Sequence, residues 1–162
     1  MTIVPLEQRD IPGCREIYNY YVKHTSFSLE EKELTAEQYE ARVTDVTERF
    51  PFLVARADAG NTAGFAYLSE FNPRSGYRCT ADLSIYMAPG LRGAGVGSAL
   101  LAAIEAEGRK MGFTNLISLI TDENTASCRF HEKNGFVKEG HLHGIAVKFG
   151  RLCGLCYYRK AL

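Results

Sequence analysis

The sequence predicts an α/β domain in which helices cover a mixed sheet, and two observations lead to that prediction. Strand-like segments dominate the first half of the chain, and strand and helix patterns then alternate to the end, an order typical of a sheet flanked by helices. The chain has 162 residues, 46% of them hydrophobic and 23% charged, which suits one core without disulfides or a structural metal. Because no repeat, low-complexity segment or linker divides the chain, we expect residues 1–162 to form a single domain.

Hydrophobic periodicity and turn signals give the expected elements. Apolar residues at three- and four-residue spacing over residues 14–22 predict a first helix, which Asp10 caps. Thr35 and Gln38 stand at capping-box spacing and predict a second helix over residues 35–48. The same reasoning predicts helices over residues 98–111 and 124–134 and strands over residues 3–6, 52–57, 62–69, 80–87, 115–120, 136–142 and 152–158.

Composition argues against several classes of partner. Lys and Arg total 19, as do Asp and Glu, so the formal net charge is zero and nothing indicates nucleic acid binding. No run approaches the ~18 apolar residues of a membrane span. Five cysteines, an odd number, occur without a signal-peptide pattern at the start of the chain, so we expect a reducing, cytoplasmic environment.

The most informative chemical signal is a glycine-rich turn between a predicted strand and a predicted helix. It reads Arg92-Gly93-Ala94-Gly95-Val96-Gly97-Ser98. Glycines let the backbone approach a ligand closely, and the free N–H groups of a first helical turn suit a phosphate. A dinucleotide-binding turn is the competing interpretation, but Ser98 or Leu100 stands where G-x-G-x-x-G needs its third glycine.

The turn resembles the R/Q-x-x-G-x-G/A pyrophosphate loop of the GNAT superfamily of acyl-CoA N-acyltransferases. Residues 124–136, NTASCRFHEKNGF, resemble that superfamily's later N-x-x-S-x-x-(F/L)-(Y/H)-E-K-x-G-F segment. Four further segments resemble the phosphinothricin and methionine sulfoximine N-acetyltransferases: Ile17-Tyr18-Asn19, Pro73-Arg74-Ser75-Gly76-Tyr77, Ser84-Ile85-Tyr86 and Phe130-His131-Glu132.

The resemblance implies a mostly antiparallel GNAT sheet, acetyl-CoA as co-substrate and the α-amine of a small amino-acid-like acceptor. It implies that the pantetheine arm is bound along a strand by Ile85, Tyr86 and Met87. It implies that the pyrophosphate is bound by the turn Arg92, Gly93, Ala94, Gly95, Val96, Gly97 and Ser98. The cofactor site would be completed at the start of a later helix by Asn124 and Ser127.

Acetyl transfer to an amine requires a proton acceptor for the ammonium group and a proton donor for the departing thiolate. Asp82 stands where the resembled enzymes usually carry Glu, so we expect it to deprotonate the acceptor through a water. This role requires a raised pKa, because an ordinary Asp is a poor base at neutral pH. His131 stands where many members carry the tyrosine that protonates the thiolate, and imidazole titrates near neutrality.

Four residues are candidates for the acceptor site. Arg74 suits a bidentate pair with a substrate carboxylate, and Tyr77 lies in the same loop. Phe27 and Glu30 match positions that line the pocket of the resembled group. We expect the tyrosines of the first helix to pack in the core, with a pocket role for Tyr18 alone.

The last strand contains Cys153-Gly154-Leu155-Cys156, with His141 and His143 nearby in sequence. We expect no metal here, because residues three apart on a strand face opposite sides and a second C-x-x-C is missing. The resemblance also weakens at this point. The phosphinothricin group tends to have Trp and Asp where this chain has Leu152, Cys153 and Gly154.

Three functions remain open at this level: a small-amine acetyltransferase, an acyltransferase of a protein or peptide amine, and a catalytically silent acyl-CoA-binding module. The first predicts acetyl-CoA consumption that depends on an amino-acid-like acceptor, the second an open groove. A homodimer is implied by the resemblance alone.

Overall fold

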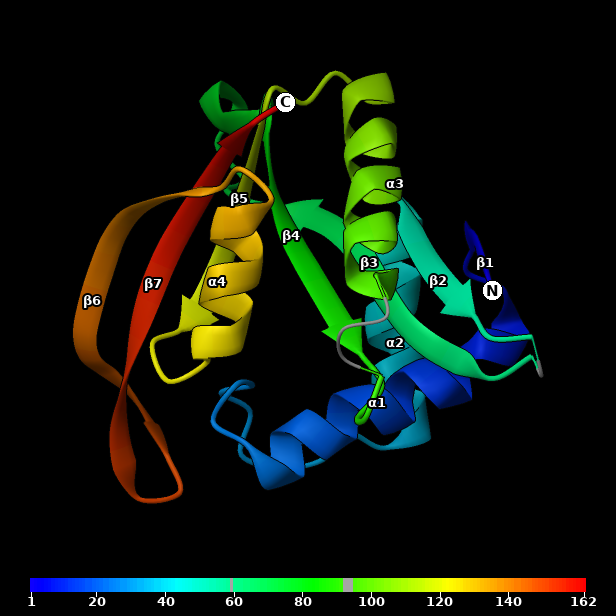
Figure 1. Cartoon of the computed structure of the whole chain (residues 1–162), viewed down its shortest axis with the longest axis horizontal. Helices are drawn as coiled ribbons and strands as arrows, with labels where there is room; N and C mark the ends of the chain where they lie inside the picture. The colour runs from blue at the N-terminus through cyan, green and yellow to red at the C-terminus, as the bar shows by residue number, and fades with distance from the viewer. Residues whose placement is uncertain (59, 92–94) are drawn as a thin grey trace.

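The computed structural model describes residues 1–58, 60–91 and 95–162. Its strands are β1 (Thr2–Pro5), β2 (Phe52–Arg56), β3 (Thr62–Glu70), β4 (Thr80–Met87), β5 (Asn115–Thr121), β6 (Val137–Lys148) and β7 (Arg151–Ala161). They form one sheet in the order β1-β2-β3-β4-β5-β7-β6 (Figure 1). Only β4 and β5 pair in parallel; the other neighbours are antiparallel. The prediction of a mixed sheet is confirmed.

The helices are α1 (Ile11–His24), α2 (Ala36–Thr47), α3 (Val96–Lys110) and α4 (Thr125–Lys133). The capping box predicted for α2 is confirmed: Thr35 Oγ1 accepts from Gln38 N at 3.2 Å, and Gln38 Oε1 accepts from Thr35 N at 3.0 Å. No helix within the described ranges is long and apolar enough to cross a membrane.

Asp10 does not cap α1 with its side chain, contrary to the prediction. Its buried carboxylate accepts instead from Arg56 Nε at 2.8 Å and Arg56 Nη2 at 2.6 Å. This bidentate pair with β2 uses the carboxylate more fully than a helix N-H would, and it holds the pKa of Asp10 below its usual value. The start of α1 is therefore fixed to the sheet.

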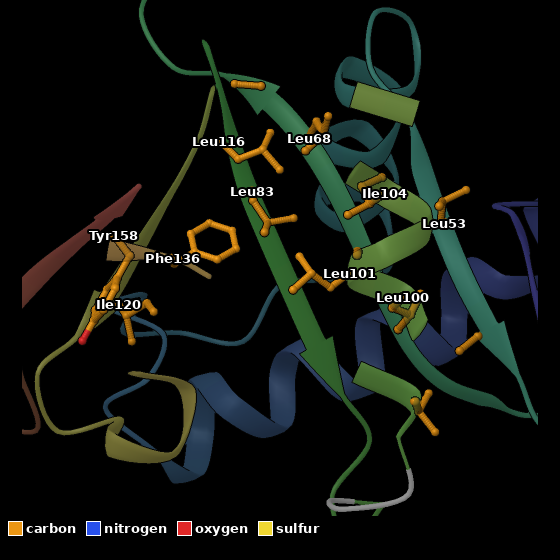
Figure 2. Close-up of a cluster of buried hydrophobic side chains, with 14 of the residues drawn as sticks. Leu53, Leu68, Leu83, Leu100, Leu101, Ile104, Leu116, Ile120, Phe136 and Tyr158 are labelled. Carbon is orange, nitrogen blue, oxygen red and sulfur yellow. The ribbon is translucent and has the colours of Figure 1, made fainter. Parts of the chain in front are cut away.

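Alternation along the strands divides the core into two layers, one on each face of the sheet. Figure 1 shows α3 and α4 on one face, and α1 and α2 pack on the other. Figure 2 shows the α3 layer, which includes Leu53, Leu68, Leu83, Leu100, Leu101, Ile104 and Leu116. The α1 layer includes Ile17, Tyr18, Tyr21, Val22, Tyr39, Val43, Phe52, Val54 and Phe65.

The last two strands are longer than predicted and form one long hairpin. β6 runs on to Lys148, and β7 begins at Arg151. Phe149 and Gly150 make the turn with φ of 51° and 71°, as a two-residue turn between twisted strands requires. A register shift between Leu142 and Ala146 breaks the alternation, which explains why the pattern did not predict strand there.

Candidate active site

The site begins where β4 and β5 separate. The two strands pair in parallel only from Thr80 with Asn115 to Asp82 with Ile117. Beyond this point they part and enclose a cavity of about 450 Å³. Its wall comes from β4, the start of α3, β5 and α4, and includes Ile85, Tyr86, Met87, Gly95, Val96, Gly97, Ser98, Asn124, Ser127 and His131.

The start of α3 forms one end of this cavity. Gly95 has φ of 78°, a left-handed conformation that glycine adopts without strain. Val96, Gly97 and Ser98 follow as the first helical turn, whose N–H groups lack carbonyl partners within the helix and therefore suit an anion. Arg92, Gly93 and Ala94 of the predicted cradle lie outside the described residues.

The start of α4 forms the facing wall. Asn124 Oδ1 accepts from Ser127 N at 3.2 Å and caps the helix. One turn later, His131 Nδ1 lies 2.8 Å from Ser127 O. Since a carbonyl oxygen can only accept, Nδ1 carries the proton and Nε2 carries the lone pair.

His131 is only 2% exposed, and its ring packs against Phe136 and Tyr158. Burial lowers its pKa, so the neutral imidazole is favoured. Nε2 is buried without a hydrogen-bond partner among the described residues. An unpaired buried nitrogen in a cavity wall indicates a proton acceptor waiting for a ligand or water.

Asp82 occupies the last paired position before the strands part. Leu83, Ile85 and Met87 pack in the α3 layer, so alternation turns Asp82 to the opposite face. It is not part of the cavity wall itself. Its Oδ1 is buried without a partner within the described chain, and burial raises its pKa to about 6. The raised pKa agrees with what a catalytic base at this position requires.

The predicted acceptor residues lie in two separate loops: Phe27 and Glu30 follow α1, whereas Arg74 and Tyr77 precede β4. Phe27 lines the cavity. Glu30 Oε1 accepts from Arg42 Nη2 at 2.5 Å, while its Oε2 is buried without a partner in the described parts of the chain. Arg74 and Tyr77 are exposed and precede β4, so they lie at the end of this strand away from the loop that carries Phe27 (Figure 1).

Sequence reasoning assigned the wrong tyrosine to the pocket. Tyr21 lines the cavity, whereas Tyr18 does not. The Tyr21 hydroxyl donates to Met87 O at 2.8 Å and so ties α1 to the end of β4. Both tyrosines lie on the buried face of α1, and only tertiary structure shows which reaches the cleft. Arg42, which holds Glu30, and the buried Lys148 carried no sequence signal at all.

The two cysteines of the C-x-x-C segment lie on different faces, as expected. Cys156 packs in the α3 layer with Ile120 and Tyr158, and Cys153 does not. Neither belongs to the group Asp122, His141 and His143, whose possible ligand atoms lie within 4.8 Å of one another. Asp122 Oδ2 lies 3.0 Å from His141 Nε2, so these two groups satisfy each other.

The cavity lies between two parted strands and has a glycine-rich helix start on one side. This arrangement agrees with the acyltransferase class that the sequence motifs indicated. The chain belongs to the acetyltransferase (GNAT) family, whose model matches residues 14–136. Members of this family use acetyl-CoA as acyl donor.

One relative and two solved structures show which members of the family this chain is similar to. The chain is 36% identical to a phosphinothricin N-acetyltransferase of Alcaligenes faecalis over 152 residues, covering 93% of this chain and 77% of the relative. A ribosomal-protein-alanine N-acetyltransferase structure from Brucella melitensis superposes with a TM-score of 0.95 at 32% identity, covering 100% of both chains. A phosphinothricin acetyltransferase from Sinorhizobium meliloti, solved with acetyl-CoA, superposes with a TM-score of 0.94 at 28% identity, covering 99% of this chain and 88% of that one.

The described residues fit acetyl-CoA as a ligand, and Gly97 offers a direct test of where it binds. A Cβ at Gly97 would lie 3.3 Å from Phe130 Cε2, so Gly97→Val has to displace either the first turn of α3 or the cavity wall. We expect the Kd for acetyl-CoA, measured by calorimetry, to rise about tenfold or more. Gly140→Val is the matched control, because a Cβ there meets nothing within 4 Å. Equal Kd values for the two variants would place the ligand elsewhere.

Proposed function

We propose that this acetyltransferase moves an acetyl group from acetyl-CoA to the α-amine of a small amino-acid-like acceptor, by direct transfer in a ternary complex. The acceptor is of the phosphinothricin, methionine sulfoximine or methionine sulfone type. The observation that supports this proposal is the cavity between β4 and β5. It extends from the helix starts of α3 and α4 to an aromatic wall formed by Tyr21 and Phe27. The chain acts as a single domain over residues 1–162.

The donor half of the cavity holds the acyl donor in this proposal. The first turn of α3 binds the pyrophosphate, and the parted edge of β4 from Ile85 to Met87 binds the pantetheine arm. Backbone N–H groups of a strand without a partner on that side are free donors, so they serve both the arm and the oxyanion. Asn124 and Ser127 complete the wall.

The proton steps fall to Asp82 and His131. Asp82 accepts the proton that the acceptor ammonium must lose, through a water because its short side chain lies outside the cavity wall. His131 returns a proton to the departing thiolate. Since its Nε2 carries a lone pair in the resting structure, His131 first takes up the second proton, which the attacking nitrogen loses as the amide bond forms, and then delivers it to the thiolate as the C–S bond breaks.

The second candidate function is acetylation of a protein or peptide amine. It is favoured by the name of the Brucella melitensis relative, a ribosomal-protein-alanine acetyltransferase. A peptide needs an open groove on the acceptor side, whereas Phe27, stacked against Tyr21 with ring centroids 6.2 Å apart, closes part of that side. The aromatic wall therefore favours the small acceptor.

An acceptor panel decides between the two. We expect thiol release from acetyl-CoA to depend on phosphinothricin, methionine sulfoximine or methionine sulfone, and to stay at the hydrolysis background with polyamines, a lysine peptide or a peptide that begins with alanine. Turnover confined to peptides would establish the second function instead. Arg74→Ala in the same assay tests whether Arg74 binds the acceptor carboxylate, since an unchanged acceptor KM excludes that contact.

The pKa of Asp82 predicts a pH profile. A base works in its ionised form, so kcat/KM should fall as the pH drops through about 6, roughly tenfold for each pH unit below. Asp82→Asn should lower kcat/KM at pH 7.5 and remove this limb, whereas the exposed Asp45→Asn should keep it. A limb near pH 6 that persists in Asp82→Asn would assign it to another group.

We also propose a cytoplasmic homodimer. Large apolar side chains that are 44% to 70% exposed gather on the β6–β7 hairpin: Leu142, Ile145, Val147, Phe149 and Leu152. Exposed apolar patches of this kind mark protein interfaces, and a two-fold dimer is the commonest closed assembly. Leu152→Asp should shift the mass from dimer to monomer in sedimentation equilibrium, whereas Val137→Asp, on the same strand pair but outside the patch, should not. A monomeric parent protein would refute the dimer.

A further inference from the structure

The β6–β7 hairpin buries a lysine at its tip. Lys148 is the last residue of β6, pairs with Arg151 across the turn and is 1% exposed. A buried ammonium group is costly unless hydrogen bonds replace its water. Within the described residues Lys148 forms no ion pair with a carboxylate. Its Nζ donates instead to Val22 O at 2.7 Å and to Glu30 O.

These two carbonyl groups belong to the end of α1 and to the irregular segment that follows it; Arg42, which donates to the Tyr18 hydroxyl and to Glu30 Oε1, joins the same two segments through side chains. Val22 lies in the last turn of α1, where carbonyl groups lack intrahelical donors and a positive charge is favourable. Glu30 lies in the irregular segment between α1 and α2. One ammonium group therefore joins the end of α1 to the far side of the loop over residues 25–30, from a strand more than a hundred residues further along the chain.

This loop carries part of the cavity wall. Phe27 stands between the two anchored carbonyls in sequence, lines the cavity and stacks on Tyr21. A second link holds the loop nearer the solvent: Ser26 Oγ donates to Glu123 Oε2 at 2.5 Å, and Arg151 donates to both oxygens of Glu123. Arg151 is 56% exposed, so water and salt weaken this second link. The buried Lys148 link is the stronger one.

We propose that Lys148 is a positioning residue for the acceptor: it holds the end of α1 and the 25–30 loop in the conformation in which Phe27 lines the cavity. This inference rests on the proposed function, which assigns that wall to the acceptor. In the described part of the chain, the hydrogen bonds of Lys148 go to Val22 and Glu30 and not to the starts of α3 and α4, which form the donor half. Loss of the ammonium group therefore affects the acceptor and spares acetyl-CoA.

The chemistry of the contact explains why lysine is required. A compact ammonium with three donors fits between two carbonyl oxygens, whereas the planar arginine fork is broader and presents its donors in fixed directions. Methionine keeps the length and apolar stem of the side chain but has no donor. Lys148→Met thus leaves both carbonyl groups unpaired in a buried place, which disfavours the observed loop conformation.

The test combines steady-state kinetics with hydrogen exchange on the full-length protein. For Lys148→Met we expect the acceptor KM to rise about tenfold while the acetyl-CoA KM changes less than about twofold. Amide exchange should accelerate in peptides covering residues 22–33 and stay unchanged in α3 and α4. The control is Arg159→Gln, which removes an exposed ion pair with Glu139 on the same hairpin and should change neither quantity.

A double variant separates positioning from general destabilisation. If Lys148 acts through the Phe27 wall, the effects of Lys148→Met and Phe27→Leu on the acceptor KM should be less than additive. Full additivity, equal rises of both KM values, or faster exchange throughout the chain would overturn the proposal. Should Lys148→Met fail to fold, Lys148→Arg carries the same test, with a smaller rise and the same split between substrates.

Failure of the proposed function has a different outcome. If the parent protein acetylates none of the small acceptors, the proposed acceptor class is wrong. Amide hydrogen exchange and the Kd for acetyl-CoA still test whether Lys148 holds the 25–30 loop. Faster exchange confined to residues 22–33 with an unchanged Kd for acetyl-CoA supports the anchoring role of Lys148. Unchanged exchange in that segment overturns it.

Discussion

The site depends on one constraint, the separation of β4 from β5 after a short parallel pairing. Parallel strands normally continue side by side, but here the ladder ends at Asp82 and Ile117. The backbone groups of β4 beyond that point have no strand partner on one side and must be satisfied in another way. The Tyr21 hydroxyl donates to the carbonyl of Met87, and Ser118 Oγ on β5 donates to the carbonyl of Leu83 at 3.5 Å. The same separation places two helix starts, those of α3 and α4, on either side of one cleft.

Burial then adjusts the acid-base groups around this cleft without help from strong ion pairs. Burial alone raises the pKa of Asp82 to about 6, and burial lowers the pKa of His131. In both groups burial disfavours the charged form, so it raises the pKa of the carboxyl group and favours the neutral imidazole. The cost is that Asp82 Oδ1 and His131 Nε2 are buried without a partner among the residues that the structure describes. Such atoms are expected at functional sites and are rare elsewhere.

Local signals explain why much of the fold could be predicted from the sequence. Each of these signals comes from residues a few positions apart and determines where a helix begins. They are the capping box at Thr35, the glycine-rich start of α3 and the Asn124 cap of α4. The anchor at Lys148 is different, because its partners Val22 and Glu30 are distant in sequence and accept through backbone oxygens that no residue type reveals. The same holds for Tyr21, whose place in the cavity depends on how α1 lies on β4. Arg74 matched a motif, but the motif did not show that its loop precedes β4 and so lies at the other end of that strand from the loop that carries Phe27.

The departure in the last strand has a structural counterpart on β5. Asp122 Oδ1 accepts from Gly154 N at 3.3 Å, and a Cβ at position 154 would overlap the Asp122 carboxylate. A side chain at 154 and Asp122 in its observed conformation therefore exclude each other. The Asp122 carboxylate, which directly follows β5, is also held by β6, because its Oδ2 lies 3.0 Å from His141 Nε2. Because Glu123, the next residue, accepts a hydrogen bond from Ser26 Oγ, this contact between β6, β7 and Asp122 lies beside the segment that carries Phe27. A Cβ at position 154 would also lie 2.9 Å from the backbone oxygen of Leu142, so the Asp122 carboxylate and the β6 backbone both require glycine there.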